Sequence, residues 1–238
     1  MVLVSLKYAI KDKTTAGEVA VVVDILRAST TITTSLYYGA EWIISTTDTK
    51  TAFELAEKYN AMLIGERNCL KINGFDLGNS PAEMIKEKVN GKKIVFTSTN
   101  FSKALASSMK SPIVLIGSML NISAVTKFTY ALAKEKGCDI CFMLAGNADN
   151  NADEDLAFAG VSGSILKDFC DCCIGDDVKA AIDFVNAKGA EECIKDSNHA
   201  MRLVNSGFFD DLEFACRKDI FDIVPILKNN KIYKMKQE

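Results

Sequence analysis

Histidine is nearly absent from this sequence, because His199 is the only one among 238 residues. Phosphohistidine chemistry, a Ser-His-Asp triad and a histidine-rich metal site all need imidazole at a defined place. The scarcity of histidine therefore argues against all three. His199 lies in an acidic, helical part of the sequence, far along the chain from the polar clusters described below. We expect it at the surface.

Long apolar runs and an excess of positive charge are missing as well. No run approaches the roughly 18 apolar residues of a membrane helix, and the N-terminal apolar stretch is short and followed by lysines, unlike a secretory signal. The net charge of −3 gives no electrostatic footprint for nucleic acid. We expect a cytoplasmic protein with neither membrane nor nucleic-acid partners. Its 48% hydrophobic content suffices for one domain over residues 1–238, with a possible subdomain change near residue 147.

Familiar phosphate-binding and redox motifs are also missing. There is no G-x-x-x-x-G-K-[ST] and no G-x-G-x-x-G, which disfavours nucleoside triphosphates and dinucleotides. No cysteine is followed by an arginine six positions later, and Asp24 lacks the second aspartate of a D-x-D phosphatase. The eight cysteines are spread along a large chain, so reduced thiols are expected. Cys138 and Cys141 fall in a strand-like apolar stretch, which favours core packing over metal or redox use.

What the sequence does contain is an alternation of strand and helix patterns. Six apolar runs rich in β-branched residues are continuous rather than alternating, which is typical of strands buried on both faces. Helical patterns separate them, several with Thr, Asp or Ser in cap position. This order predicts an α/β fold with three layers, α/β/α, around a largely parallel sheet, and a more helical C-terminal half. The six runs are 18–26, 41–46, 61–65, 92–98, 112–117 and 139–146; we further expect an edge strand at 2–10, a helix from near Asp153 and a hairpin across Asn229 and Asn230.

Polar residues gather where four of these strands end. Ligands of open α/β sheets bind beyond the carboxyl ends of the strands, so four such ends suggest one shared site. The second cluster lies in a loop about three times longer than the usual 4–6 residues, and its glycines are expected to fold the backbone around a small anion. The clusters are 24–31, 65–80, 97–100 and 146–155.

The use of arginine points to the ligand. Only four of the 28 cationic residues are arginines, and Arg27 and Arg67 lie in these clusters. The planar fork of arginine suits bidentate binding of phosphate or carboxylate, although a surface salt bridge is the alternative. We expect Arg67 and Lys71 to bind an anionic substrate and Arg27 to act in catalysis. Four polar residues are expected to assist in substrate binding, although Ser and Thr there are also ordinary helix caps: Asn79, Ser80, Thr99 and Asn100.

The acids of the same clusters suggest a divalent cation. Asp24 closes a very apolar strand, where a carboxylate persists only if it is paired with a cation or a metal. Carboxylate oxygens suit Mg²⁺, which binds one or two of them together with water and phosphate. We expect Asp24 and Asp76 to bind metal or act as general base, with Glu66 and Asp155 as further metal ligands. For Asp155 the alternative is strong, because acids in the first turn of a helix also complement its dipole.

Four stretches resemble, in this order and with these spacings, the 2-phosphosulfolactate phosphatase family of coenzyme M biosynthesis. The resemblance implies a Mg²⁺-dependent phosphatase that hydrolyses 2-phospho-3-sulfolactate to 3-sulfolactate and phosphate on an α/β fold unlike that of other phosphatases. It covers most of the chain, and we expect a homo-oligomer. The stretches are VVVDILRASTTI, GERNCLKINGFDLGNSPAEM, VFTSTN and AGNADNNADEDLAFAG.

One position departs from the family pattern. Where the family usually has T-N-G-T, this chain has Thr99-Asn100-Phe101-Ser102, so a bulky aromatic replaces a glycine and is expected to alter the pocket. Two alternatives therefore stay open. The chain is a phosphatase for another small phosphorylated acid, or a non-catalytic anion-binding protein that keeps the fold.

Overall fold

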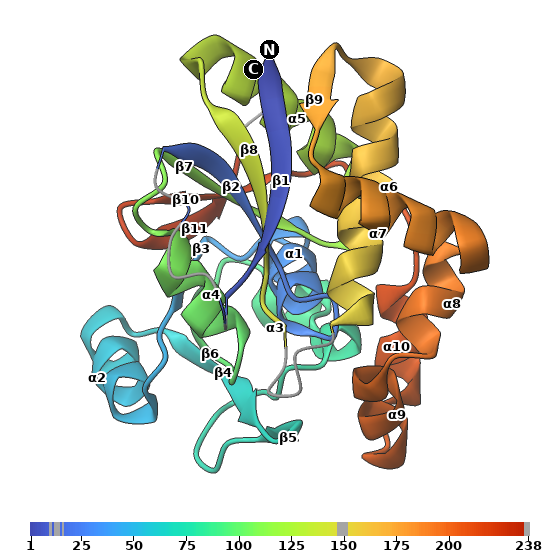
Figure 1. Cartoon of the computed structure of the whole chain (residues 1–238). Helices are drawn as coiled ribbons and strands as arrows, with labels where there is room; N and C mark the ends of the chain where they lie inside the picture. Colours follow the sequence, from blue (N-terminus) through green and yellow to red (C-terminus); the bar gives the residue numbers. More distant parts are fainter. Residues whose placement is uncertain (10, 12–14, 16, 147–151, 236–238) are drawn as a thin grey trace.

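The computed structural model describes residues 1–9, 11, 15, 17–146 and 152–235 and has the expected α/β architecture, with helices on both faces of a large, mostly parallel sheet (Figure 1). The helices are α1 (Ala28–Tyr37), α2 (Thr49–Tyr59), α3 (Lys86–Val89), α4 (Phe101–Ser108), α5 (Ile122–Lys136), α6 (Asp153–Phe169), α7 (Asp176–Lys188), α8 (Ala190–Lys195), α9 (Asn198–Asn205) and α10 (Phe209–Ala215), with single 3₁₀ turns at Pro81–Glu83 and Met119–Asn121. The strands are β1 (Val2–Tyr8), β2 (Glu18–Val23), β3 (Trp42–Ser45), β4 (Met62–Arg67), β5 (Leu70–Lys71), β6 (Lys93–Thr97), β7 (Ile113–Gly117), β8 (Asp139–Leu144), β9 (Cys172–Ile174), β10 (Pro225–Lys228) and β11 (Lys231–Lys234).

The sheet consists of two parallel blocks joined by an antiparallel hairpin. Its order is β5-β4-β6-β3-β11-β10-β7-β2-β8-β1-β9, and six of its ten strand pairs are parallel. The hairpin β10–β11 turns at Asn229 and Asn230, which both have positive φ, as the sequence predicts. It lies between β3 and β7, so the end of the chain holds the two blocks together.

Strand β2 shows why the predicted runs are continuously apolar. Its residues Val19, Val21 and Val23 pack into one core cluster together with α5, α6 and α7. Ala20 and Val22 pack on the opposite face into a second cluster with α1 and α4. Because helices cover both faces of the sheet, a strand that alternated apolar and polar residues would bury its polar side chains in one of the two cores, so the strand is apolar throughout.

Several elements differ from the sequence-based expectation. Strand β1 is not at the edge, because it pairs with β8 on one side and with the short strand β9 on the other. The helical pattern after Ser80 gives only a 3₁₀ turn and the one-turn helix α3, because the backbone leaves the helical conformation at Met84 and Ile85. Helices α6 to α10 make the second half of the chain the more helical one, as predicted. The possible subdomain change near residue 147 falls at residues outside those described.

None of the helices over residues 1–146 and 152–235 that the structure describes is long and apolar enough to span a membrane. The longest, α6, has 17 residues and carries three acids in its first turn.

Candidate active site

One pocket of about 440 Å³ lies at the carboxyl ends of β2, β4 and β6 and is closed on its remaining side by α9. Its size is within the usual range of small-molecule sites. Polar and charged side chains form most of its lining, which consists of Asp24, Leu26, Arg27, Glu66, Asn68, Cys69, Asn79, Ser98, Thr99, Asn100, His199, Arg202, Asn205 and Ser206.

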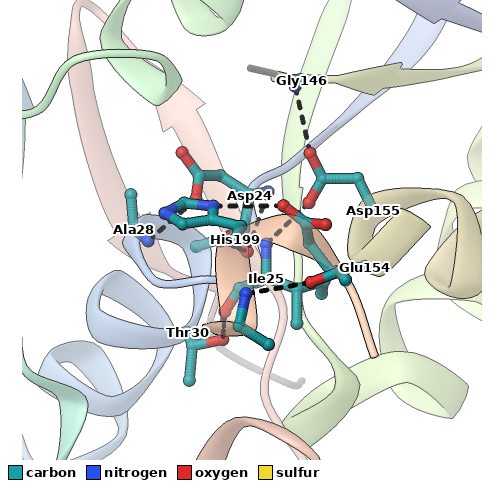
Figure 2. Close-up of polar contacts among 11 residues, drawn as sticks. Asp24, Ile25, Ala28, Thr30, Gly146, Glu154, Asp155 and His199 are labelled. Atoms are coloured by element: carbon teal, nitrogen blue, oxygen red, sulfur yellow. Dashed lines mark hydrogen bonds and ion pairs between the residues drawn. The ribbon is translucent and has the colours of Figure 1, made fainter. Parts of the chain in front are cut away.

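Asp24 lies at the junction between β2 and α1 and is only 8% exposed. One of its carboxylate oxygens accepts a hydrogen bond from the backbone N–H of Ala28 at 3.2 Å (Figure 2). Burial raises the pKa of Asp24 to about 6, although the nearby charge of His199 and the Ala28 bond oppose that rise. A carboxylate with such a pKa can hold a proton or release it near neutral pH.

Arg27 also lines the pocket, but its guanidinium is already engaged. It is 2% exposed, and it donates to Asp211 Oδ2 at 2.6 Å and to the carbonyl oxygen of Cys69 at 2.8 Å. The ring of Phe208 stacks 4.0 Å from its central carbon. Ser80 donates to the other oxygen of Asp211 at 2.5 Å. The expected arginine is therefore present, and α10 fixes its position.

Glu66 and the turn after β6 form a further part of the strand-end wall of the pocket. Glu66 Oε1 accepts from both the backbone N–H and the hydroxyl of Thr99, while Oε2 accepts from the backbone N–H of Cys69. Two buried oxygens of the lining have no hydrogen-bond partner among the described residues: Asn79 Oδ1 and Ser98 Oγ. Unpaired buried polar atoms are costly, so their presence in a pocket is a sign that a ligand or water completes them.

Two further buried acids, Glu154 and Asp155, lie near Asp24 (Figure 2). Both oxygens of Asp155 accept backbone N–H bonds, from Ile25 at 2.8 Å and from Gly146 at 3.1 Å. Burial, together with the charges of Glu154 and Asp24, raises the pKa of Asp155 well above its usual range. Asp155 therefore joins the ends of β2 and β8 rather than lining the pocket. Residues 147–151 of this predicted cluster lie outside the described part of the chain.

His199 is not the surface residue that the sequence suggested. Its side chain is 16% exposed, it lines the pocket, and its Nδ1 lies 3.1 Å from Glu154 Oε1 (Figure 2). Burial lowers the pKa of His199, but hydrogen bonds with Cys69 and Glu154 and the charges of Glu154 and Asp24 outweigh burial and raise it to about 10. The imidazole is therefore a cation near neutral pH. It was missed because sequence distance says nothing about how α9 folds back on the strand ends.

The long segment 65–80 follows a path that explains its length. After β4 it turns at Asn68 and Cys69, both with positive φ, and pairs as β5 with the end of β4. It then returns to the start of β4, where Asp76 Oδ2 accepts from Leu63 N at 2.7 Å, and runs parallel to β4 to reach the pocket at Asn79.

This path leaves four expected site residues outside the pocket lining. Ser80 is one of them, because its hydroxyl donates to Asp211 behind Arg27. Asp76 lies at the amino end of β4, away from the pocket, so it does not share a site with Asp24. Lys71 is exposed on β5 and is not part of the lining. Arg67 donates to the carbonyl oxygens of Glu66 and Thr47 and to the Thr97 hydroxyl, and it is likewise not part of the lining. Arg67 directly follows Glu66 in β4, and successive side chains of a strand point to opposite faces. Beyond β5 the chain returns to the amino end of β4, which takes Asp76 away from the pocket.

The expected role of the glycines in this segment is also corrected. A Cβ on Gly65 would collide with the carbonyl oxygen of Thr97, so this glycine allows β4 and β6 to approach closely. Gly74 has a φ of 81° and packs beside the ring of Phe53 in the turn that precedes Asp76. Neither glycine belongs to the pocket lining.

Phe101, at the position where the resemblance leads one to expect a glycine, is not part of the pocket lining either. Its side chain is fully buried and meets Phe96 edge-on, with ring centroids 6.2 Å apart. The departure at this position therefore adds to the core below α4. Asn100, directly before it, remains in the lining as predicted.

Arg202 and Asp211 are further residues that sequence reasoning missed. Arg202 lines the pocket from α9, three residues after His199, and Asp211 holds Arg27 from α10. A signal was present, because Arg202 is one of only four arginines and shares a helix face with the single histidine. The acidic surroundings of this half of the chain concealed it.

The donor set of the pocket suits Mg²⁺ in part. Over the residues that the structure describes, no group of three His, Cys, Asp or Glu side chains is arranged to hold a metal. Asp24 and Glu66 nevertheless line one pocket together with Asn79, whose buried Oδ1 has no hydrogen-bond partner among the described residues. Mg²⁺ needs only one or two carboxylates when water and phosphate complete its shell, so these three residues fit the cation. Asp76 and Asp155 are not part of the pocket lining.

Comparisons with known proteins give a consistent picture. Residues 5–230 match the family model described as 2-phosphosulpholactate phosphatase. A probable 2-phosphosulfolactate phosphatase of Thermotoga maritima is 39% identical over 212 residues, which cover 88% of this chain and 89% of that protein. Proteins of the same name from Caldanaerobacter subterraneus and Clostridium perfringens are 36% and 35% identical and cover 93% and 97% of this chain and 92% and 94% of their own lengths.

Proposed function

Since the chain belongs to the 2-phosphosulpholactate phosphatase family of phosphoric monoester hydrolases, we propose that it hydrolyses 2-phospho-3-sulfolactate to 3-sulfolactate and phosphate with the aid of Mg²⁺. The observation that carries this proposal is the burial of Asp24 and Arg27, with opposite charges, at the end of one strand in the 440 Å³ pocket. A small phosphorylated acid needs such a combination of a cation and an oxygen-rich wall.

The residues of the pocket divide the work between them. Arg27 has two of its five N–H groups committed to Asp211 and Cys69, which leaves others to hold the phosphate oxygens. Ser98, Thr99 and Asn100, which directly precede α4, supply hydroxyl and amide groups to the pocket lining. Because the fold fixes these groups before the substrate arrives, they favour the in-line geometry of phosphoryl transfer.

Asp24 orients the attacking water and accepts its proton, for which a pKa of about 6 is suitable. When bound, Mg²⁺ would neutralise charge on the phosphate oxygens, and Asp24, Glu66 and Asn79 are the residues that would hold it. Whether Asp24 works mainly as base or as cation ligand, its removal takes away a group directed at the reacting phosphate.

Phosphate release from 2-phospho-3-sulfolactate tests the proposal, with 2-phospholactate and phosphoglycolate as competing substrates and with Mg²⁺ present or chelated. We expect the highest kcat/KM with 2-phospho-3-sulfolactate and loss of turnover on chelation. If another phosphorylated acid is hydrolysed with a higher kcat/KM, that acid is the substrate and the present assignment is wrong. If 2-phospho-3-sulfolactate binds without turnover, the chain is an anion-binding protein and not an enzyme. The expected self-association stays a prediction, which analytical ultracentrifugation of the same preparation checks.

A further inference from the structure

Helix α9 directs one face at the pocket. His199, Arg202, Asn205 and Ser206 all contribute to the lining, at spacings of three, three and one residue. Residues three and four apart share a face of a helix, so this set covers about two turns of α9. The pocket therefore has a strand-end wall, with Asp24, Arg27 and Glu66, and a separate helical wall.

The other face of α9 fixes its orientation. Ala200 and Leu203 are fully buried in the core cluster that includes α6 and α7. The Ser197 hydroxyl caps the helix by accepting from the backbone N–H of Ala200 at 3.1 Å. His199 is tied to Glu154 of α6 in addition. With these anchors the helix cannot rotate, and the face that carries His199 and Arg202 is held toward the pocket.

The two walls hold different cations. On the strand-end wall Arg27 is buried and framed by Asp211, whereas Arg202 lies at the exposed mouth of the pocket and His199 deeper on the same helix face. The latter two are three residues apart on the helix, a rise of about 4.5 Å along its axis. Two acid groups on adjacent carbon atoms, such as a carboxylate and a sulfonate, can meet two side chains that project from one helix face into one pocket.

We propose that His199 and Arg202 of α9 bind the acid groups in the tail of the substrate and thereby determine specificity, while the phosphate lies against the strand-end wall. This inference rests on the proposed function for the identity of the tail. It assigns to α9 the choice among phosphorylated acids and leaves the chemical step to the residues around Asp24.

The deciding experiment separates tail from phosphate by measuring the binding of each alone. Calorimetric titrations with 3-sulfolactate and with inorganic phosphate compare the unaltered protein with Arg202→Gln. We expect the variant to weaken 3-sulfolactate at least about tenfold, the scale of one charge-assisted hydrogen bond, and to change the phosphate Kd less than about twofold. Arg217→Gln is the matched control, because Arg217 is also exposed on the C-terminal helical region, rests against Phe214 and is not part of the pocket lining.

A second variant tests the deeper cation. His199→Asn keeps an amide donor for Glu154 but removes the charged ring, so it too is expected to weaken 3-sulfolactate and spare phosphate. In kinetic assays Arg202→Gln is expected to raise KM for 2-phospho-3-sulfolactate while leaving kcat/KM for ethyl phosphate, which has no acidic tail, within about twofold. His199→Asn is compared by binding alone, because the charge of His199 also acts on Asp24. Equal losses with tailed and tail-less ligands, or no loss with either, would overturn the inference.

The outcomes separate the inference from the proposed function. If 3-sulfolactate binds through Arg202 but 2-phospho-3-sulfolactate is not hydrolysed, the proposed function fails and the α9 assignment stands. If the substrate is hydrolysed and Arg202→Gln binds 3-sulfolactate normally, the α9 assignment alone fails.

Discussion

The segments 24–31 and 65–80 look alike in sequence and differ in use. Both are polar, both follow a buried strand, and each contains an acid and an arginine. In the first, Asp24 and Arg27 both reach the pocket. In the second, Arg67 and Asp76 bind backbone groups of their own neighbourhood, and only Glu66, Asn68, Cys69 and Asn79 join the lining. A polar residue at a strand end is therefore a candidate ligand-binding residue, and the path of the chain decides whether its side chain faces the pocket or binds a backbone group.

The difference has a geometric cause. Segment 24–31 enters α1 at once, so every residue stays at the carboxyl end of β2. Segment 65–80 travels down to the start of β4 and returns before it reaches α1, where the Thr31 hydroxyl donates to the Asn79 carbonyl oxygen at 3.1 Å. The two segments thus meet at their ends, while the middle of the second serves the sheet edge.

The largest expected effect separates the two arginines. Arg27→Ala leaves Asp211 charged and buried without its partner, which typically costs about 3–5 kcal/mol. It should also lower turnover at least about a hundredfold. Arg67→Ala removes hydrogen bonds of a half-buried side chain and should cost about 1 kcal/mol, with turnover nearly unchanged. Urea unfolding and phosphate release measure both.

A double variant keeps this comparison interpretable. Arg27→Ala combined with Asp211→Ala removes both buried charges, so it should regain part of the stability and none of the activity. Equal losses for Arg27→Ala and Arg67→Ala would show that both segments contribute in the same way, contrary to their contacts.

Asp24→Asn is expected to lower kcat at least about a hundredfold, or about 2.7 kcal/mol in transition-state free energy. The midpoint of thermal unfolding should not fall, because burial disfavours the charged form of Asp24 and the amide removes that cost. Steady-state kinetics measure the change in kcat, and calorimetry of the same protein measures the midpoint of thermal unfolding. Loss of stability in step with activity would indicate a structural role for Asp24 instead.

His199 links the segments, because it contacts Cys69 of the second and interacts with the charge of Asp24 in the first. Its pKa of about 10 in the folded state exceeds its ordinary 6.5, so the folded state binds the proton more tightly. The resulting stability is fully present below pH 6.5 and is lost as pH rises toward 10, at about 1.4 kcal/mol per pH unit in that window. The difference in unfolding free energy between the unaltered protein and His199→Gln should shrink accordingly, and a constant difference from pH 7 to 10 would contradict it.

The smallest expected effect belongs to Asp76. Asp76→Ala removes an acceptor for Leu63 N at an exposed position, which should cost about 0.5–1.5 kcal/mol of stability. Turnover should stay within about twofold, because the residue lies at the opposite end of β4 from the pocket. A drop in kcat of more than tenfold with normal stability would show that Asp76 belongs to the active site after all.

The sequence predicted nine of the eleven described strands, missing only the short β5 and β9, together with the largely parallel arrangement and much of the strand-end wall. Continuous apolar runs identify buried strands because both faces of the sheet are covered, and strand ends identify where polar groups can meet a ligand. Asp24, Arg27, Glu66, Asn79, Thr99 and Asn100 were found in this way and do line one pocket. The insertion of β10 and β11 between the two parallel blocks had no such signal, because the sequence of a hairpin does not indicate which other strands it will pair with.

By itself, then, the sequence determined the class of fold, the family and the residue types that a phosphatase of small acids needs, because local periodicity and motif spacing are properties of neighbouring residues. Only the tertiary structure decided which polar side chains line the pocket. It turned Asp76 and Arg67 to the backbone, brought His199 and Arg202 of α9 to the pocket from the far end of the chain, and placed Asp211 behind Arg27. The physical reason is that burial and long-range pairing set the partners of a charge, and neither is encoded in the residues beside it.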